Sequence, residues 1–206
     1  MLEIIPNSHN GGYPQPENSP NYLDVSFNWA SCPCPNCTIG ISQAKPLRLK
    51  SSTKLGRHDI SGIWWIREAF IVSNALKEKI EEEQLTGVEF WPVIKHGKNE
   101  AFEDVFQLKI TGTLPPMDPS TNILFKRESD LGIRTCPNGC GMRALKSVPR
   151  YRAEDVHHVS DFALSSEWFG SYHAYWRVPF LSQRAYRLFK EWKVKGIRYV
   201  PVQIVE

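Results

Sequence analysis

The chain lacks the features of a membrane or secreted protein. It contains no apolar run of the roughly 18 residues that are needed to cross a bilayer. Its first twenty residues, MLEIIPNSHNGGYPQPENSP, include neither the basic segment nor the apolar segment of a secretory signal. We therefore predict a cytoplasmic protein with no membrane association.

The chain also has little excess of charge of one sign. It carries 25 Lys and Arg against 22 Asp and Glu, which gives a net charge of +3. Dedicated nucleic-acid-binding domains usually carry a much larger basic excess, so we expect no nucleic-acid partner. A hydrophobic content of 41% is sufficient for a folded core.

Cysteine is scarce, and its distribution is uneven. The chain has five cysteines, an odd number, whereas secreted disulfide frameworks usually have an even and denser set. They form two tight clusters with none in between, Cys32, Cys34 and Cys37 in the first and Cys136 and Cys140 in the second. Such clustering indicates metal or redox chemistry.

The cysteine spacing is typical of a structural zinc site. Cys34-Pro-Asn-Cys37 has the C-x2-C spacing of a zinc hook, and Cys136-Pro-Asn-Gly-Cys140 is a longer variant. Closing the 98-residue loop between the two pairs costs about 4 kcal/mol plus a constant. Structural zinc binding contributes roughly 10 to 16 kcal/mol. We therefore predict one structural Zn²⁺ with Cys34, Cys37, Cys136 and Cys140 as its ligands.

Two other roles for the cysteines remain open. A redox motif requires its first cysteine at a helix N-terminus, which lowers the thiol pKa. Gly40 and Pro46 interrupt any helix that would follow the first cluster, and this disfavours the redox hypothesis. Structural cysteines without a metal are the second alternative. If zinc is bound, Cys32 could replace Cys34 as a ligand.

Part of the chain is repeated. Residues 70–93 and 179–202 align without a gap at a spacing of 109 residues. In both segments a Ser can cap a helix N-terminus and a Gly can form the turn into the next strand. These residues are Ser73 and Ser182 before the helices, and Gly87 and Gly196 after them.

The repeat leads to a prediction for the fold. We expect one compact α+β domain over residues 1–206, built from two pseudo-repeated helix-turn-strand units at about 25–112 and 130–206. Mixed or antiparallel sheets would accompany a few short helices. The four-cysteine zinc site would join the two units.

The two cysteine pairs and the closing segment WFGSYHAYWRVPFLSQRAYRLFKEWKVKGIRYVPVQIV resemble the double-CXXCG motif family. The resemblance covers most of the chain and the order of its parts. Cys34 and Cys37 match the first pair of the family, and Cys136 and Cys140 match the second. The family includes myxobacterial immunity proteins, which are paired with toxins. The resemblance therefore implies a non-catalytic antitoxin that binds and neutralises a cognate toxin protein.

The sequence departs from the family motif at two points. Thr38 follows Cys37 where the motif has Gly, and the second pair contains one additional residue before Cys140 and Gly141. Both changes keep the thiols in place, so metal binding still fits. They weaken the match to the family, however.

Two further functions are alternatives. The first is a zinc-ribbon-like module that binds nucleic acid or regulates another protein, since residues 177–198 carry seven basic side chains against Glu191 alone. The second is an enzyme, because His58-Asp59 and the segment EDVHHVSD at 154–161 contain residue types that perform acid-base chemistry. Their spacing matches no catalytic motif, so we predict a protein that is not an enzyme.

Overall fold

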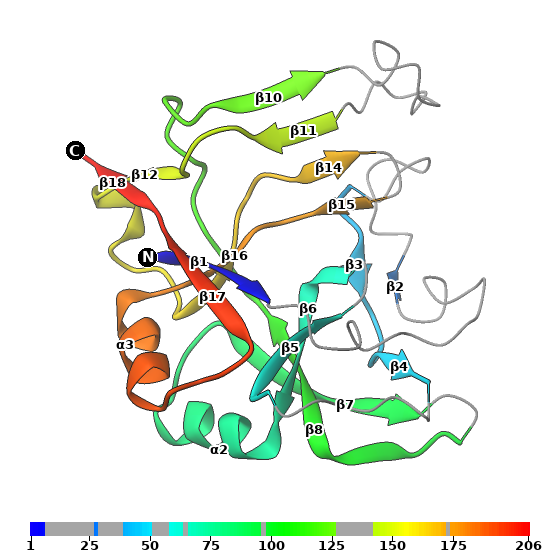
Figure 1. Ribbon diagram of the computed structural model, residues 1–206. Helices are drawn as coiled ribbons and strands as arrows, with labels where there is room; N and C mark the ends of the chain where they lie inside the picture. The colour runs from blue at the N-terminus through cyan, green and yellow to red at the C-terminus, as the bar shows by residue number, and fades with distance from the viewer. Residues whose placement is uncertain are drawn as a thin grey trace.

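Strands are the main regular structure among the described residues (Figure 1). This computed structural model describes eight stretches of the chain, residues 1–6, 27–28, 39–50, 58–63, 66–95, 98–126, 142–171 and 174–206. Within them are 18 strands but only two α-helices and one 3-10 helix. The helices are α2 (Asn74–Glu82), α3 (Gln183–Glu191) and η3 (Glu154–Val156).

The predicted α+β fold of helix-turn-strand units is therefore wrong, because the described part of the chain is mostly β. Fifteen of the 18 strands have five residues or fewer. Segments this short give no clear alternation of polar and apolar residues, whereas the helices have a visible period. The helices could therefore be predicted from the sequence, whereas most of the strands could not.

The first sheet has five strands. Across it lie β4 (Arg48–Leu49), β7 (Val88–Lys95), β8 (Ala101–Ile110), β6 (Ile66–Ser73) and β5 (Ile60–Ile63). The pairs are antiparallel except β4 with β7, which is parallel. Helix α2 follows β6 directly and leads through a turn into β7.

The second sheet also has five strands. Across it lie β17 (Ile197–Pro201), β1 (Leu2–Pro6), β16 (Pro179–Leu181), β13 (Phe162–Leu164) and β9 (Gly112–Thr113). The pairs are antiparallel except β13 with β9. Helix α3 connects β16 to β17, as α2 connects β6 to β7.

Three smaller sheets complete the described structure. The largest contains β10 (Ile123–Lys126), β11 (Met142–Leu145), β14 (Phe169–Ser171) and β15 (Ala174–Trp176). The others pair β12 (Arg150–Arg152) with β18 (Gln203–Val205), and β2 (Phe27–Asn28) with β3 (Ser42–Gln43). In Figure 1 the four-stranded sheet lies at the top, and the two helices lie next to each other at the lower left.

The first two sheets share one strand order and one register. Strands β5, β6, β8 and β7 of the first correspond to β13, β16, β1 and β17 of the second. Pro92 lies opposite Phe106, for example, and the equivalent Pro201 lies opposite Leu2. The repeat is thus larger than a helix-turn-strand unit. In the second sheet, the strand that corresponds to β8 is β1, which comes from the start of the chain. Neither predicted unit includes this strand.

The equivalence extends beyond these four strands. The amide of Ile94 donates to the carbonyl of Leu47, and the amide of Gln203 donates to the carbonyl of Pro149, both at 2.9 Å. Strand β4 thus lies against β7 as β12 lies against β18. Each pairing is parallel and occupies the same place in its unit.

The predicted helix caps are confirmed. The hydroxyl of Ser73 accepts a hydrogen bond from the amide of Leu76 at 3.2 Å. The hydroxyl of Ser182 accepts one from the amide of Ala185 at 3.0 Å. Each Ser therefore satisfies one backbone donor of the first helical turn.

The predicted glycine turns are also confirmed. Gly87 and Gly196 have φ values of 80° and 109°, a region that L side chains rarely adopt. A Cβ on Gly87 would lie 2.1 Å from the carbonyl oxygen of Phe162, and one on Gly196 would lie 1.9 Å from that of Ile60. Each turn of one unit thus packs directly on a strand of the other.

One apolar core joins the first two sheets and the helices. Its buried residues include Phe70 and Leu108 from the first sheet, Ile4 and Phe162 from the second, and Ile80 and Phe189 from the helices. Phe162 and Phe189 meet edge to face with ring centroids 5.9 Å apart. Burying a side chain of this size contributes about 1.5 to 3 kcal/mol, so the core holds both units together. A second core between β16 and the four-stranded sheet includes Phe169 and Phe180.

Candidate functional site

The predicted zinc ligands lie outside the residues that the structure describes. This applies to Cys34, Cys37, Cys136 and Cys140, and also to Cys32. Within the described stretches, no group of three or more His, Cys, Asp or Glu side chains is arranged to hold a metal ion. The zinc site and its ligands therefore remain predictions.

Each cysteine pair lies between two strands that pair with each other. The first pair lies in the connection between β2 and β3, and the second in the connection between β10 and β11. Both strand pairs are antiparallel. The same spacing of 102 residues separates Cys34 from Cys136 and Arg48 from Arg150. Four thiolates are the donor set that a closed zinc site prefers, and a zinc site with these ligands stays a prediction.

A partly buried ion pair links equivalent positions of the two units. Glu68 and Arg177 are 109 residues apart, the spacing of the repeat, and one carboxylate oxygen of Glu68 accepts from the backbone amide of Arg177 at 2.6 Å. The other oxygen lies 3.1 Å from the guanidinium. Burial raises the pKa of Glu68, and the charge of Arg177 opposes this shift. Because two equivalent residues touch each other, this pair lies near the approximate two-fold axis that relates the units.

Two aspartates each connect one unit to the turn that follows the helix of the other unit. Asp59 accepts from the amide of Lys195 at 2.8 Å through its carboxylate. Asp161 accepts from the amide of Thr86, the residue equivalent to Lys195, at 3.0 Å. The two aspartates are themselves 102 residues apart. The units are therefore interlocked by a reciprocal pair of carboxylate contacts.

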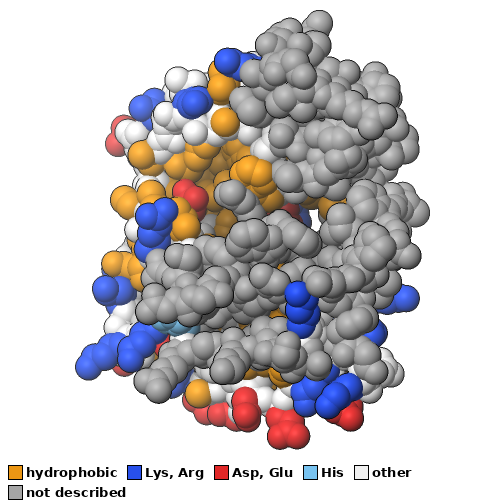
Figure 2. All heavy atoms as spheres, turned by 45° about the vertical axis from the view of Figure 1, so that its right-hand side comes forward, with side chains coloured by type: hydrophobic (Ala, Val, Ile, Leu, Met, Phe, Trp, Pro, Cys, Tyr) orange, Lys and Arg blue, Asp and Glu red, His pale blue; other side chains and the backbone are white. Residues whose placement is uncertain are grey.

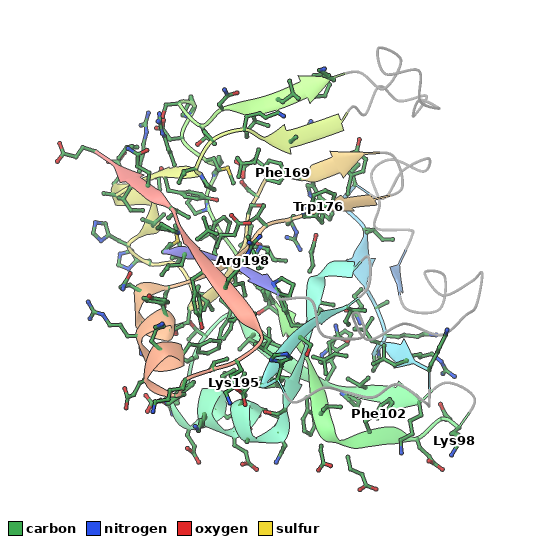
Figure 3. All side chains as sticks on the ribbon, viewed as in Figure 1. Lys98, Phe102, Phe169, Trp176, Lys195 and Arg198 are labelled. Atoms are coloured by element: carbon green, nitrogen blue, oxygen red, sulfur yellow. The ribbon has the colours of Figure 1, made fainter. Side chains whose placement is uncertain are left out.

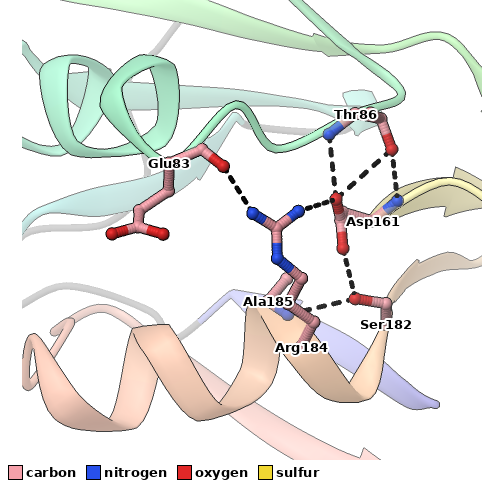
Figure 4. A network of polar contacts seen from close by, with 6 residues as sticks. All are labelled: Glu83, Thr86, Asp161, Ser182, Arg184 and Ala185. Atoms are coloured by element: carbon pink, nitrogen blue, oxygen red, sulfur yellow. Dashed lines mark hydrogen bonds and ion pairs between the residues drawn. The ribbon is translucent and has the colours of Figure 1, made fainter.

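The contacts of Asp161 are the more extensive of the two (Figure 4). The residue is 7% exposed, and its carboxylate accepts from the hydroxyl of Ser182 at 2.6 Å. It also lies 3.1 Å from the guanidinium of Arg184, which donates to the carbonyl of Glu83 at the end of α2 as well. Asp161 thus links the turn after α2 to the start of α3.

The candidate acid-base residues of the sequence are not gathered into one site among the described residues. Asp59 and Asp161 make the structural contacts above, and His58 lies beside Asp59 on the edge of the first sheet. His157 and His158 are exposed just after η3, while Glu154 lies 3.8 Å from Arg152. Nothing in this arrangement points to a catalytic centre.

Surface charge differs sharply between the two units. Figure 2 shows acidic side chains gathered along the lower edge of the molecule, the edge that α2, β7 and β8 form in Figure 1. Figure 3 shows Lys195 at the turn after α3 and Arg198 on β17. At four equivalent positions a Glu of the first unit is matched by a basic residue of the second. These pairs are Glu68 and Arg177, Glu78 and Arg187, Glu81 and Lys190, and Glu89 and Arg198.

A groove of about 520 Å³ lies beside the start of β8. Pro92 pairs with Phe106 but Ile94 pairs with Ala101, so the start of β8 bulges relative to β7, although Val105 still pairs with Ser73 of β6. The groove is lined by apolar side chains of β6 and by polar ones that include His58, Lys95, Glu103 and Asp104. Bulges of this kind often reposition side chains at binding sites. The phenyl ring of Phe102, labelled in Figure 3, packs under the amine of Lys95.

Sequence reasoning missed the interlocking aspartates. A signal was available, because HDIS at 58–61 and SDFA at 160–163 have the same spacing as the cysteine pairs. After this point the spacing between equivalent residues changes from 102 to 109. The reason is that β14 and β15 lie between β13 and β16 in the second unit, whereas the equivalent strands β5 and β6 follow each other directly in the first. A single constant spacing therefore aligns only the second half of the repeat.

Comparison with known proteins gives no assignment. No family model matches the chain, and no curated protein matches it. Among the described residues, no helix is long and apolar enough to cross a membrane.

Proposed function

We propose that the chain is a non-catalytic immunity protein that binds and neutralises a cognate bacterial toxin. The proposal rests on the resemblance of its cysteine pairs and closing segment to the double-CXXCG motif family. The observation that supports it furthest is that each cysteine pair lies in the sequence between two strands that pair antiparallel, β2 with β3 and β10 with β11. Such a duplicated scaffold is suited to present a rigid surface to a partner protein.

Zinc would have a structural role in this protein. Cys34, Cys37, Cys136 and Cys140 would hold it, and four thiolates leave no open position for a substrate. The ion would fasten the hairpin of β2 and β3 to that of β10 and β11. The rest of the scaffold is held by the shared core and the aspartate contacts.

The bulge of β8 is the surface that we assign to the toxin. Glu103 and Asp104 are exposed there beside the groove, and neither has a side-chain partner among the described residues. If the toxin has a basic cleft, these acidic side chains would complement it and increase the association rate. The bulge also offers Phe102 and the apolar floor of the groove for close packing.

Co-expression tests the function and the surface together. The chain is produced with the toxin encoded by the neighbouring gene, and survival and co-purification are measured. We expect rescue by the wild type and loss of rescue by Glu103→Lys/Asp104→Lys. The matched control is Glu154→Lys/Asp155→Lys, which changes the same two residue types at an exposed site far along the chain. If the wild type neither rescues the cells nor binds the toxin, the immunity proposal is wrong.

The basic surface of α3 favours one alternative function, binding of nucleic acid. Arg187, Lys190, Lys193 and Lys195 are exposed on and just after this helix. Affinity for DNA or RNA that falls steeply with salt, and that is lost in Arg187→Glu/Lys190→Glu, would support it. An affinity that this variant leaves unchanged would exclude α3 as the binding surface.

A further inference from the structure

The two helices form one continuous outer face. The amine of Lys79 in α2 lies 5.7 Å from the ring centre of Trp192, which ends α3. Arg184 of α3 donates to the carbonyl of Glu83, which ends α2. Both helices turn their apolar side chains into the same core. Their opposite sides therefore lie next to each other at the surface, as Figure 1 shows at the lower left.

This face is acidic on one helix and basic on the other. Residues 74–87 contain four Glu and two Lys, whereas residues 183–196 contain five Lys or Arg and a single Glu. Glu78 and Glu81 are exposed in α2, and the equivalent Arg187 and Lys190 are exposed in α3. Arg187 and Lys190 have no side-chain partner among the described residues.

The fold does not require this difference in charge. Both helices begin with the same Ser cap, have nine residues, end before the same Gly turn and pack on the same core. Opposite charges at equivalent exposed positions therefore leave the scaffold unchanged. These charges instead determine which partner surfaces can bind to this face.

The approximate two-fold axis that relates the two units also relates α2 to α3, and the charge of the face is opposite on its two sides. Such a face is complementary to the same face of a second copy. When a second copy is turned by a two-fold axis that lies in the plane of the face, its α3 can lie over the first copy's α2. Its α2 then lies over the first copy's α3. A single two-fold operation satisfies both contacts, and such closed pairs are the commonest symmetric assemblies.

We propose that the face formed by α2 and α3 is a self-association surface, on which α2 of each copy lies against α3 of a second copy of this chain. This assembly goes beyond toxin binding and uses a different surface from the β8 bulge. Glu78 and Glu81 of one copy would face Arg187 and Lys190 of the other.

The complex would be weak and sensitive to salt. Exposed ion pairs contribute little individually and are screened by added salt. Glu82 and its equivalent Glu191 are both acidic and exposed, so they would oppose each other across the contact. Half-buried Leu188 and Trp192 add apolar surface to the face.

Charge reversal tests the proposal. Glu78→Arg/Glu81→Lys makes both helices basic, and Arg187→Glu/Lys190→Glu makes both acidic. Sedimentation velocity at about 50 mM salt should show self-association of the wild type, with an association constant about tenfold lower at about 500 mM. Each double variant alone should be a monomer. A mixture of the two variants should form a mixed dimer.

Several results would overturn the proposal. They are a monomeric wild type at low salt, double variants that still self-associate, and a mixture that stays monomeric although circular dichroism shows both variants folded. Association of the wild type only when DNA or RNA is added would assign the basic helix to nucleic acid instead. The Glu154→Lys/Asp155→Lys control should self-associate like the wild type. Toxin rescue by the double variants would be a separate result, since it depends on the β8 surface.

Discussion

Glu3 is an ionisable residue at a position where the other unit has a neutral one. It lies opposite Phe180 and Val200 in the second sheet, and the equivalent residue in the first sheet is Gln107. The amide of Gln107 exchanges hydrogen bonds with Gln43 at 2.9 and 2.5 Å. Burial raises the pKa of Glu3, and the nearby Arg198 partly opposes this.

The raised pKa of Glu3 predicts a dependence of stability on pH. The folded protein holds the Glu3 proton more tightly than the unfolded chain does, so stability falls as pH rises above the ordinary value of 4.5. Glu3→Gln should remove this loss. We expect the free energy of unfolding at pH 7 to increase by a few tenths to about 1 kcal/mol, with a flatter profile between pH 4.5 and 7.

Urea unfolding across this pH range measures the effect of Glu3→Gln. The exposed Glu154→Gln is the control, and its profile should follow the wild type. A less stable Glu3→Gln protein at pH 7 would show that the charge of Arg198 outweighs the cost of burial.

The elements of the two units depend on each other through Asp59 and Asp161. Asp161 is buried and accepts hydrogen bonds from Thr86 and Ser182 beside the guanidinium of Arg184. Asp59 accepts one backbone bond through its carboxylate. Removing a buried acceptor leaves its donors unsatisfied, so the two positions should respond differently.

Alanine substitution measures this difference. Asp161→Ala should lower the free energy of unfolding by about 3 kcal/mol, because several donors and a cation lose their shared buried partner. Asp59→Ala should cost about 1 kcal/mol. Chemical unfolding monitored by tryptophan fluorescence compares the two variants. Equal costs, or a cost below about 1 kcal/mol for Asp161→Ala, would contradict the role assigned to the Asp161 network.

The sequence predicted those parts of the elements that depend on local chemistry. The Ser caps and Gly turns were predicted because each acts within a few residues of itself. Strand β1 was not assigned to the second sheet, because its partners Leu181 and Val200 are almost the whole chain away. Asp161 had the residue type of an acid-base group, but only the fold shows that Thr86 and Arg184 surround it.

At the scale of the whole molecule, the structure changes the role expected of zinc. The prediction made the ion the link between two units. In the described residues, the shared core and the two aspartates already join the first and second sheets. In our proposal, a zinc ion bound by Cys34, Cys37, Cys136 and Cys140 would instead fasten the pair β2 and β3 to the pair β10 and β11.

The duplication explains why those cysteines would act together. The spacing of 102 residues relates Cys34 to Cys136 and Asp59 to Asp161 alike. Glu68 and Arg177, which are themselves equivalent, touch each other near the two-fold axis. A single ion bound by equivalent cysteines from both units would also lie near that axis.

The central claim is therefore that equivalent cysteines of the two units bind one ion. X-ray absorption at the zinc edge, together with metal analysis of protein purified without chelator, tests it most directly. The account predicts one zinc per chain with four sulfur neighbours at about 2.3 Å. A chain that contains no zinc, or zinc bound mainly by nitrogen or oxygen, would contradict it.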